Sequence, residues 1–143
     1  MERIEFTEDL KTGIAAIDEQ HKQLVDIYHE LITAMEAHHG NRVMNEILAR
    51  LFQYSKEHFA DEEALLKEHA YDRIEDHQDK HSELVKALRR YILRHTRGGE
   101  RITQEVVSFI GSWITDHILV EDMAYVDCLN NPAAKEKEPE PAR

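Results

Sequence analysis

Apolar residues recur at steps of three and four in four long stretches of this chain, and this periodicity most restricts what the chain can fold into. The stretches span residues 18–38, 42–69, 73–95 and 102–129. Steps of three and four place apolar side chains on one face of an α-helix. Each stretch is long enough for several helical turns. The sequence therefore predicts four amphipathic helices and an all-α fold.

Three short breaks separate the predicted helices. They contain Gly, Asn and Asp, which are typical of helix caps and turns: His39-Gly40-Asn41, Ala70-Tyr71-Asp72 and Thr96-Arg97-Gly98-Gly99. Short links between long helices favour antiparallel neighbours. We therefore expect an antiparallel up-down-up-down four-helix bundle, with residues 1–17 as an N-terminal arm laid across one end of the bundle.

The length of 143 residues fits a single domain. We expect this domain to span residues 1–130, including the arm. The last stretch, residues 131–143, offers no large apolar side chain that would anchor it to a core. The sequence therefore predicts a disordered tail there.

The charge balance limits the partners of the chain. With 29 acidic and 18 basic side chains the net charge is −11, which makes nucleic acid and anionic membrane surfaces improbable partners. The single cysteine, Cys128, cannot form an internal disulfide, the N-terminus is charged, and no apolar run approaches the roughly 18 residues of a membrane span. We expect a cytoplasmic protein without a membrane anchor, and a monomer, because no predicted helix has a second long apolar face.

Histidine interrupts the inward-facing apolar seam of every predicted helix. These seams contain six chemically active side chains: His21, His58, Glu62, His77, His81 and His117. Asp122 follows on the adjoining stripe of the last helix, facing the same interior. In an antiparallel bundle the early parts of the first and third helices are level with the late parts of the second and fourth. All seven residues therefore crowd toward one end of the bundle.

Burying seven polar groups without partners would cost on the order of several kcal/mol, and a metal centre removes this cost. Residues four apart stand one above the other on a helix, so such pairs can reach one cluster. A tetrahedral zinc ion would leave three of the seven ligands unused, whereas two octahedral ions bridged by carboxylates use all of them. Imidazole with carboxylate suits iron. The ferritin-like pattern is absent from the seams, because its Glu-x-x-His pair occurs only at a helix end, as Glu36 and His39.

The other histidines are predicted to lie outside this cluster: His29, His38, His39, His69 and His95. They fall at helix ends or off the seams, where water can satisfy them. Glu63 follows Glu62 but should point about 100° away from it around the helix. We therefore expect Glu63 to be solvated.

Four stretches that contain the candidate ligands resemble the hemerythrin family, specifically its single-domain bacterial members, over residues 4–129. They read Gly-Ile-x-x-Ile-Asp-x-Gln-His-Lys at 13–22, His-Phe-x-x-Glu-Glu at 58–63, His-x-x-x-His at 77–81 and Trp-Ile-x-x-His-Ile-x-x-x-Asp at 113–122. Each stretch is a weak signal alone, but their joint occurrence in family order is highly specific.

The resemblance implies an oxygen-carrying centre of two non-heme iron ions, bridged by Glu62, Asp122 and an oxo or hydroxo group. It also implies that one iron is saturated by three histidines: His77, His81 and His117. The second iron would be held by His21 and His58, with a position left open for dioxygen.

Reversible dioxygen binding requires a pocket that excludes water and acidic side chains. The apolar neighbours of the candidate ligands supply the expected lining, namely Phe59, Leu66, Trp113, Ile114 and Ile118. The leading hypothesis is thus a non-enzymatic protein for oxygen carriage, storage or local supply, with an unknown recipient. One alternative is a di-iron oxygen or redox sensor. Another is a di-iron oxidase or peroxidase, whose proton donor would have to be Tyr28 or Tyr125.

Overall fold

Four α-helices make up most of the computed structural model, which describes residues 3–97, 104–117 and 122–126. They are α1 (Ala15–Glu36), α2 (Asn41–Glu68), α3 (Ile74–Arg97) and α4 (Gln104–Asp116), with short 3₁₀ turns η1 (Glu8–Leu10) and η3 (Met123–Tyr125). The residues that the structure describes contain no β-strand. The predicted all-α class is confirmed.

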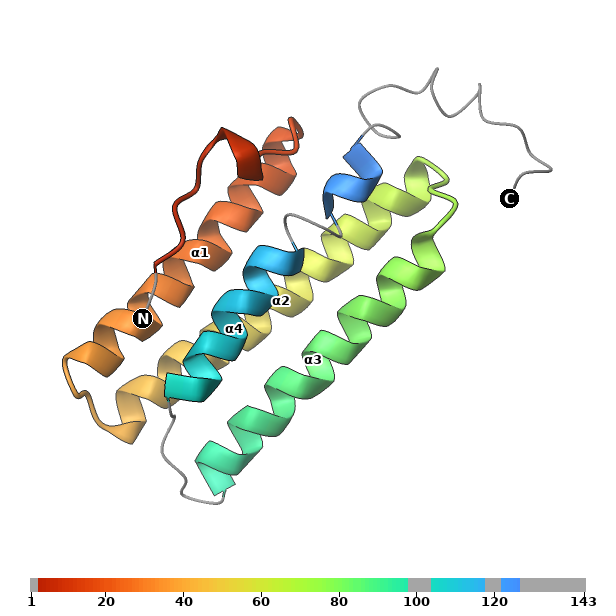
Figure 1. The fold of residues 1–143 in the computed structure, drawn as a ribbon. Helices are drawn as coiled ribbons and strands as arrows, with labels where there is room; N and C mark the ends of the chain where they lie inside the picture. Colours follow the sequence, from red (N-terminus) through yellow and green to blue (C-terminus); the bar gives the residue numbers. More distant parts are fainter. Residues whose placement is uncertain (1–2, 98–103, 118–121, 127–143) are drawn as a thin grey trace.

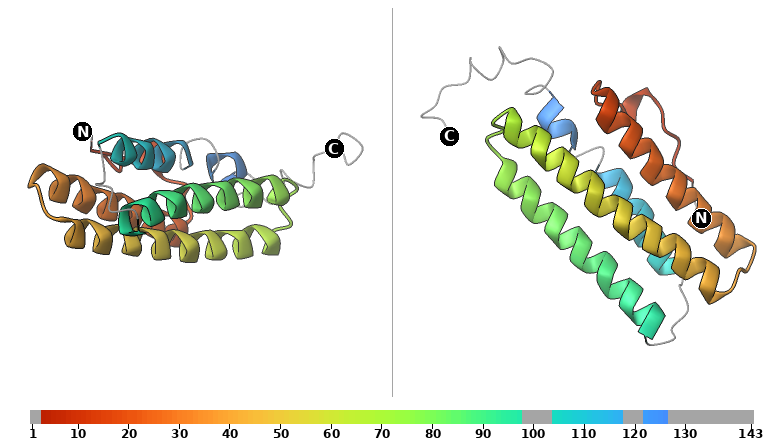
Figure 2. Two further views of the ribbon diagram at one scale, coloured as in Figure 1. Left: turned by 90° about the horizontal axis from the view of Figure 1, so that it is seen from below. Right: turned by 180° about the vertical axis from the view of Figure 1, so that it is seen from behind.

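The helices form a closed four-helix bundle in which successive helices run in opposite directions (Figures 1 and 2). The main contacts join α1 to α2, α2 to α3, α3 to α4 and α4 back to α1. This closed order places each helix between two neighbours. It confirms the up-down-up-down bundle predicted from the short links between the helices.

The first three helices begin and end within three residues of the predicted bounds, but the fourth differs. The sequence predicts one α-helix over 102–129, whereas α4 ends at Asp116 and residues Met123–Tyr125 form a 3₁₀ turn. The prediction of an α-helix at 123–125 is therefore wrong. Residues 118–121 and 127–143, including the predicted disordered tail, lie outside the described part of the chain.

The first two helices end on left-handed residues that are not glycine. His38 has a φ of 57° and Ala70 a φ of 52°. The next backbone N–H groups reach back across five residues, His39 to the Ala34 carbonyl and Tyr71 to the Leu66 carbonyl, each at 3.0 Å. This is the Schellman pattern, which satisfies carbonyls left over at a helix end.

The N-terminal arm lies lengthwise along α1 rather than across one end of the bundle (Figures 1 and 2). Arg3 forms an ion pair of 3.0 Å with Glu36 at the end of α1, and the Thr12 N–H donates to Asp18 near its beginning. The predicted placement was wrong. The arm's apolar side chains pack against the main core along this path, namely Ile4, Phe6 and Leu10.

The buried residues separate into a large apolar core, a polar layer and a small apolar cluster at the end of the bundle. The small cluster consists of Leu66, Tyr71 and Tyr125. Between it and the large core lie most of the buried polar side chains, including all seven candidate ligands. Within the described helices none is both long and apolar enough to cross a membrane.

Candidate metal centre

All four helices contribute to the polar layer, and the structure brings the seven predicted ligands together in it. One or two come from each helix or its end: His21 from α1, His58 and Glu62 from α2, His77 and His81 from α3, His117 directly after α4, and Asp122 directly before η3. None of them is more than 3% exposed. The antiparallel arrangement produces this meeting, because it aligns the beginnings of α1 and α3 with the ends of α2 and α4.

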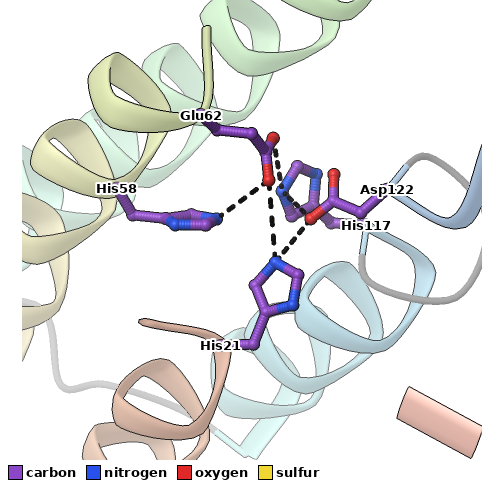
Figure 3. A group of neighbouring side chains, drawn as sticks. All are labelled: His21, His58, Glu62, His117 and Asp122. Atoms are coloured by element: carbon purple, nitrogen blue, oxygen red, sulfur yellow. Dashed lines mark ion pairs between the residues drawn. The ribbon is translucent and has the colours of Figure 1, made fainter. Parts of the chain in front are cut away.

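Glu62 lies at the centre of the layer, and its two carboxylate oxygens face different histidines. Figure 3 shows Glu62 and Asp122 between His21, His58 and His117. The Oε1 atom of Glu62 lies near three Nε2 atoms, 2.8 Å from His77, 3.0 Å from His81 and 3.6 Å from His117. The Oε2 atom lies 3.4 Å from His58 Nε2 and 3.7 Å from His21 Nε2. Glu62 thus has the position of a bridge between two groups of histidines.

Asp122 is the second carboxylate that faces both groups. Its Oδ2 atom lies 2.5 Å from His21 Nε2 and 3.1 Å from His117 Nε2, while Oδ1 lies 3.2 Å from His77 Nε2. The backbone at both His117 and Asp122 is of the π-helical kind, which is wider than an α-helix and is frequent at functional sites. Their side chains meet at one point despite the five-residue separation.

These atoms form two overlapping sets, each suited to one metal ion. One set contains His21 and His58, the other contains His77 and His81, and both include the same three residues: Glu62, His117 and Asp122. Within each set the ligand atoms lie within 4.8 Å of one another. The arrangement can hold two neighbouring ions that share carboxylates.

Burial and close charges act against each other on the ionisable groups. Burial lowers the pKa of His21 and His77, but their contacts with Asp122 and Glu62 more than offset it and raise both pKa values to about 9. Burial dominates at His58 and lowers its pKa to about 3. Burial also acts to raise the pKa of Glu62 and of Asp122, yet the surrounding histidines hold both below their usual range. Without metal, the two carboxylates are therefore charged.

Many polar atoms in the layer lie close to one another but, among the described residues, without the geometry of a hydrogen bond. They include both ring nitrogens of His21 and His117, the Nε2 atoms of His58 and His81, and both oxygens of Asp122. Buried polar groups are otherwise paired in proteins, so orphaned atoms require an explanation. Imidazole nitrogens and carboxylate oxygens are metal ligands, and a bound cation would satisfy them together. The residues present fit a metal centre.

Two residues that sequence reasoning did not assign to the site contact candidate ligands at their outer nitrogens, which are the ring nitrogens that point away from the polar layer. His58 Nδ1 lies 2.7 Å from Gln20 Oε1, and His81 Nδ1 lies 2.7 Å from Glu63 Oε2. Glu63, which we expected to be solvated, has a side chain that is 27% exposed and also contacts His81 on α3, which the sequence reasoning did not predict. A signal did exist: metal-bound histidines need an outer acceptor, and Gln20 and Glu63 each adjoin a ligand in the sequence.

The predicted apolar lining is divided by the polar layer. Phe59 stacks on the His81 ring with centroids 3.9 Å apart, and its centroid lies 6.0 Å from that of Trp113. Trp113 and Ile114 are buried in the same core cluster as Phe59. Leu66 lies instead with the small end cluster, and Ile118 falls outside the described residues.

The two tyrosines named as possible proton donors lie in different places. The Tyr125 hydroxyl donates to Glu62 Oε2 over 2.9 Å, and burial together with nearby carboxylates raises the pKa of Tyr125 well above its usual value. Tyr28 is buried in the large core, with its ring against Gly111 of α4. Tyr125 therefore contacts the candidate ligand Glu62.

The other histidines with described side chains stay outside the cluster, as predicted. His29 accepts a hydrogen bond from the Ile4 N–H, and His69 Nδ1 lies 3.0 Å from the Leu65 carbonyl oxygen. His38 and His39 are exposed at the end of α1. The side chain of His95 lies outside the described part of the structure.

Comparisons with known proteins agree with this geometry. The model of the hemerythrin HHE cation binding domain family matches residues 12–129. The chain is 29% identical over 131 residues to a bacteriohemerythrin of Pseudomonas aeruginosa (strain LESB58), covering 92% of this chain and 84% of the relative. It is 31% identical over 122 residues to the bacteriohemerythrin of Stenotrophomonas maltophilia (strain R551-3), covering 85% and 78%.

Solved structures show the same fold. A crystal structure of wild-type hemerythrin matches with a TM-score of 0.76 and 27% identity, covering 82% of this chain and 90% of that one. A hemerythrin mutant matches with a TM-score of 0.77 and 25% identity, covering 82% and 89%. The family model spans most of the sequence and every candidate ligand, and this chain therefore belongs to the hemerythrin family.

Proposed function

We propose that this chain binds dioxygen reversibly at a non-heme di-iron centre, for oxygen carriage, storage or local supply. One observation carries the proposal: two sets of buried ligand atoms overlap at Glu62 and Asp122. Two shared carboxylates between two groups of histidines are the arrangement expected of a bridged pair of ions, and this mixed donor set suits iron.

The histidines are divided unequally between the two ions in this proposal. By family similarity, His77, His81 and His117 hold one iron, and His21 with His58 hold the other. By geometry alone His117 belongs to both ligand sets, so its assignment to the iron of His77 and His81 rests on the family similarity. The iron with fewer histidines keeps a position open for dioxygen.

The bound iron pair would supply two electrons to dioxygen and take them back on release. The protein's part is to exclude water and acids from the site. Phe59, Trp113 and Ile114 contribute apolar surface on the large-core side of the polar layer. All three are buried, which supports reversible binding over reaction with solvent.

The contacts of Tyr125 favour binding over an enzymatic reaction at the open position. Its ring centroid lies 5.5 Å from that of His77, in the set proposed to be saturated. Its hydroxyl proton is donated to Glu62. The oxidase or peroxidase alternative needs a free proton donor at the open position, whereas this proton is engaged on Oε2, the Glu62 oxygen that faces His58 and His21.

The test is to load the protein with iron, reduce it without air, admit dioxygen and remove it again while the visible spectrum is recorded. We expect a coloured form that develops with dioxygen and disappears on its removal over repeated cycles. Irreversible oxidation, or steady dioxygen consumption with a reductant, would support the enzymatic alternative. One zinc ion per chain in a metal assay of the purified protein would contradict the di-iron proposal. A monomeric state and a cytoplasmic location stay predictions.

A further inference from the structure

The outer nitrogens of His58 and His81 are held by different chemical groups. The amide nitrogen of Gln20 donates to Asp61 Oδ2 over 2.9 Å, which leaves the amide oxygen to face His58 Nδ1. The carboxylate of Glu63, which is only an acceptor when charged, faces His81 Nδ1. Both rings therefore carry a proton on Nδ1 and direct the Nε2 lone pair toward the polar layer.

These two histidines belong to different ligand sets. His58 is in the set with His21, and His81 is in the set with His77. One metal position thus has a ligand backed by a neutral amide, and the other has a ligand backed by a carboxylate. The charge of Asp61 lies one hydrogen bond farther out, on an exposed side chain, where water screens it.

The surroundings of Glu63 fix the geometry of its contact with His81. Glu63 lines a groove of about 450 Å³ between α2 and α3, together with His81, Lys56 and Lys86. Phe59 stacks on His81 with an interplanar angle of 12°, which holds the ring plane so that Nδ1 meets Glu63.

We propose that Glu63 and Gln20 are positioning residues for His81 and His58, and that their difference in charge makes the two metal positions unequal. The position beside His81 then favours the higher oxidation state. A carboxylate partner raises the basicity of a histidine ligand, and hydrogen bonds around a metal site shift its reduction potential. The inference rests on the proposed di-iron centre.

Three variants on α2 test this proposal. Glu63→Gln keeps the shape and a hydrogen-bond acceptor but removes the charge, and Glu63→Ala removes the partner altogether. Glu57→Gln is the matched control, because Glu57 is exposed and also adjoins a ligand in the sequence. The readouts are the midpoint potential of the iron couple and the rate at which a chelator removes iron.

We expect Glu63→Gln to raise the midpoint potential, while Glu57→Gln leaves it at the wild-type value. Glu63→Ala should release iron about 10- to 100-fold faster, and Glu63→Gln less than that. Potentials that are the same in Glu63→Gln and Glu57→Gln would overturn the proposal, even if Glu63→Ala is less stable. Because Glu63→Gln preserves the side-chain shape, its result stands if Glu63→Ala fails to fold.

The experiment also separates this inference from the function itself. If the iron protein does not bind dioxygen reversibly, the potentials and release rates still decide the role of Glu63. If the protein takes up no iron, cobalt(II) replaces it, and the readouts become its visible bands and its release rate. Bands and rates that Glu63→Gln leaves unchanged would then overturn the proposal.

Discussion

The hydroxyl of Tyr125 donates a hydrogen bond of 2.9 Å to Glu62 Oε2, across 63 positions of sequence. Both side chains are fully buried, and the tyrosine ring meets that of His77 edge-on. The contact joins the last described turn of the chain to the central carboxylate on α2. It closes the polar layer on the side of the small end cluster.

Tyr125→Phe should lower the free energy of unfolding by about 1–2 kcal/mol, because Glu62 loses a donor while the ring keeps its packing. Reversible dioxygen binding should persist. Urea unfolding and oxygenation cycles measure the two effects. Tyr91→Phe is the control, since Tyr91 packs against Phe109 outside the site. Loss of reversibility in Tyr125→Phe alone would assign the phenol a part in ligand chemistry.

His81→Ala and His117→Ala should both reduce iron per chain, because each removes a ligand from the set proposed to be saturated. His39→Ala should retain the wild-type content, because His39 is exposed at the end of α1. Iron assays on protein purified in parallel give the comparison. Equal loss in all three variants would refute the division between ligands and other histidines.

Metal loading at pH 7 should release protons. In the metal-free protein the pKa values of His21 and His77 are raised to about 9, so both rings are protonated at pH 7. A metal ion must displace these protons, so about two per chain should come from the histidines, and water that forms a hydroxo bridge would add about one more. Calorimetric titration with iron(II) in buffers of different ionisation enthalpy counts them. Proton release near zero at pH 7 would contradict the raised pKa values of His21 and His77.

The same shifts predict how the stability of the metal-free protein depends on pH. A histidine whose pKa is higher in the folded than in the unfolded state stabilises the fold. This stabilisation is fully present at pH values below the pKa of the unfolded state. For His21 and His77 this contribution is complete below pH 6.5 and is lost as the pH rises through about 9. Unfolding experiments across this range should show stability falling, and a rise would contradict the prediction.

Gly111→Ala should destabilise the protein by about 1–3 kcal/mol through overpacking. An added Cβ would lie 2.6 Å from Tyr28 Cζ and closer still to its hydroxyl oxygen. Combining the change with Tyr28→Phe should recover part of the loss, because the nearest atom is removed. Ser112→Ala, on the exposed neighbour, should change stability by less than about 0.5 kcal/mol. Urea unfolding ranks the variants, and equal effects at both positions would contradict the close-packing argument.

The ligand cluster was predictable because it depends on helical periodicity and antiparallel order. His77 and His81 share a seam by spacing alone, and short links align them with His58 and Glu62. Their proximity was therefore expected, and they do lie together in the structure; that they bind iron stays a prediction. The contact of Glu63 with His81 was not predicted, because the direction of the Glu63 side chain was compared with that of Glu62 alone and the packing of α3 against α2 was not considered.

By itself, the sequence determined the helices, their order and the layer where the polar seams coincide. Local periodicity and link length suffice for these, because they follow from backbone geometry repeated along each element. Only the tertiary structure decided that the arm lies along α1, that Leu66 is separated from Phe59, and that Gln20 and Glu63 hold the outer nitrogens. These relationships depend on how side chains from different elements meet, and one-dimensional spacing does not encode the distances between helices.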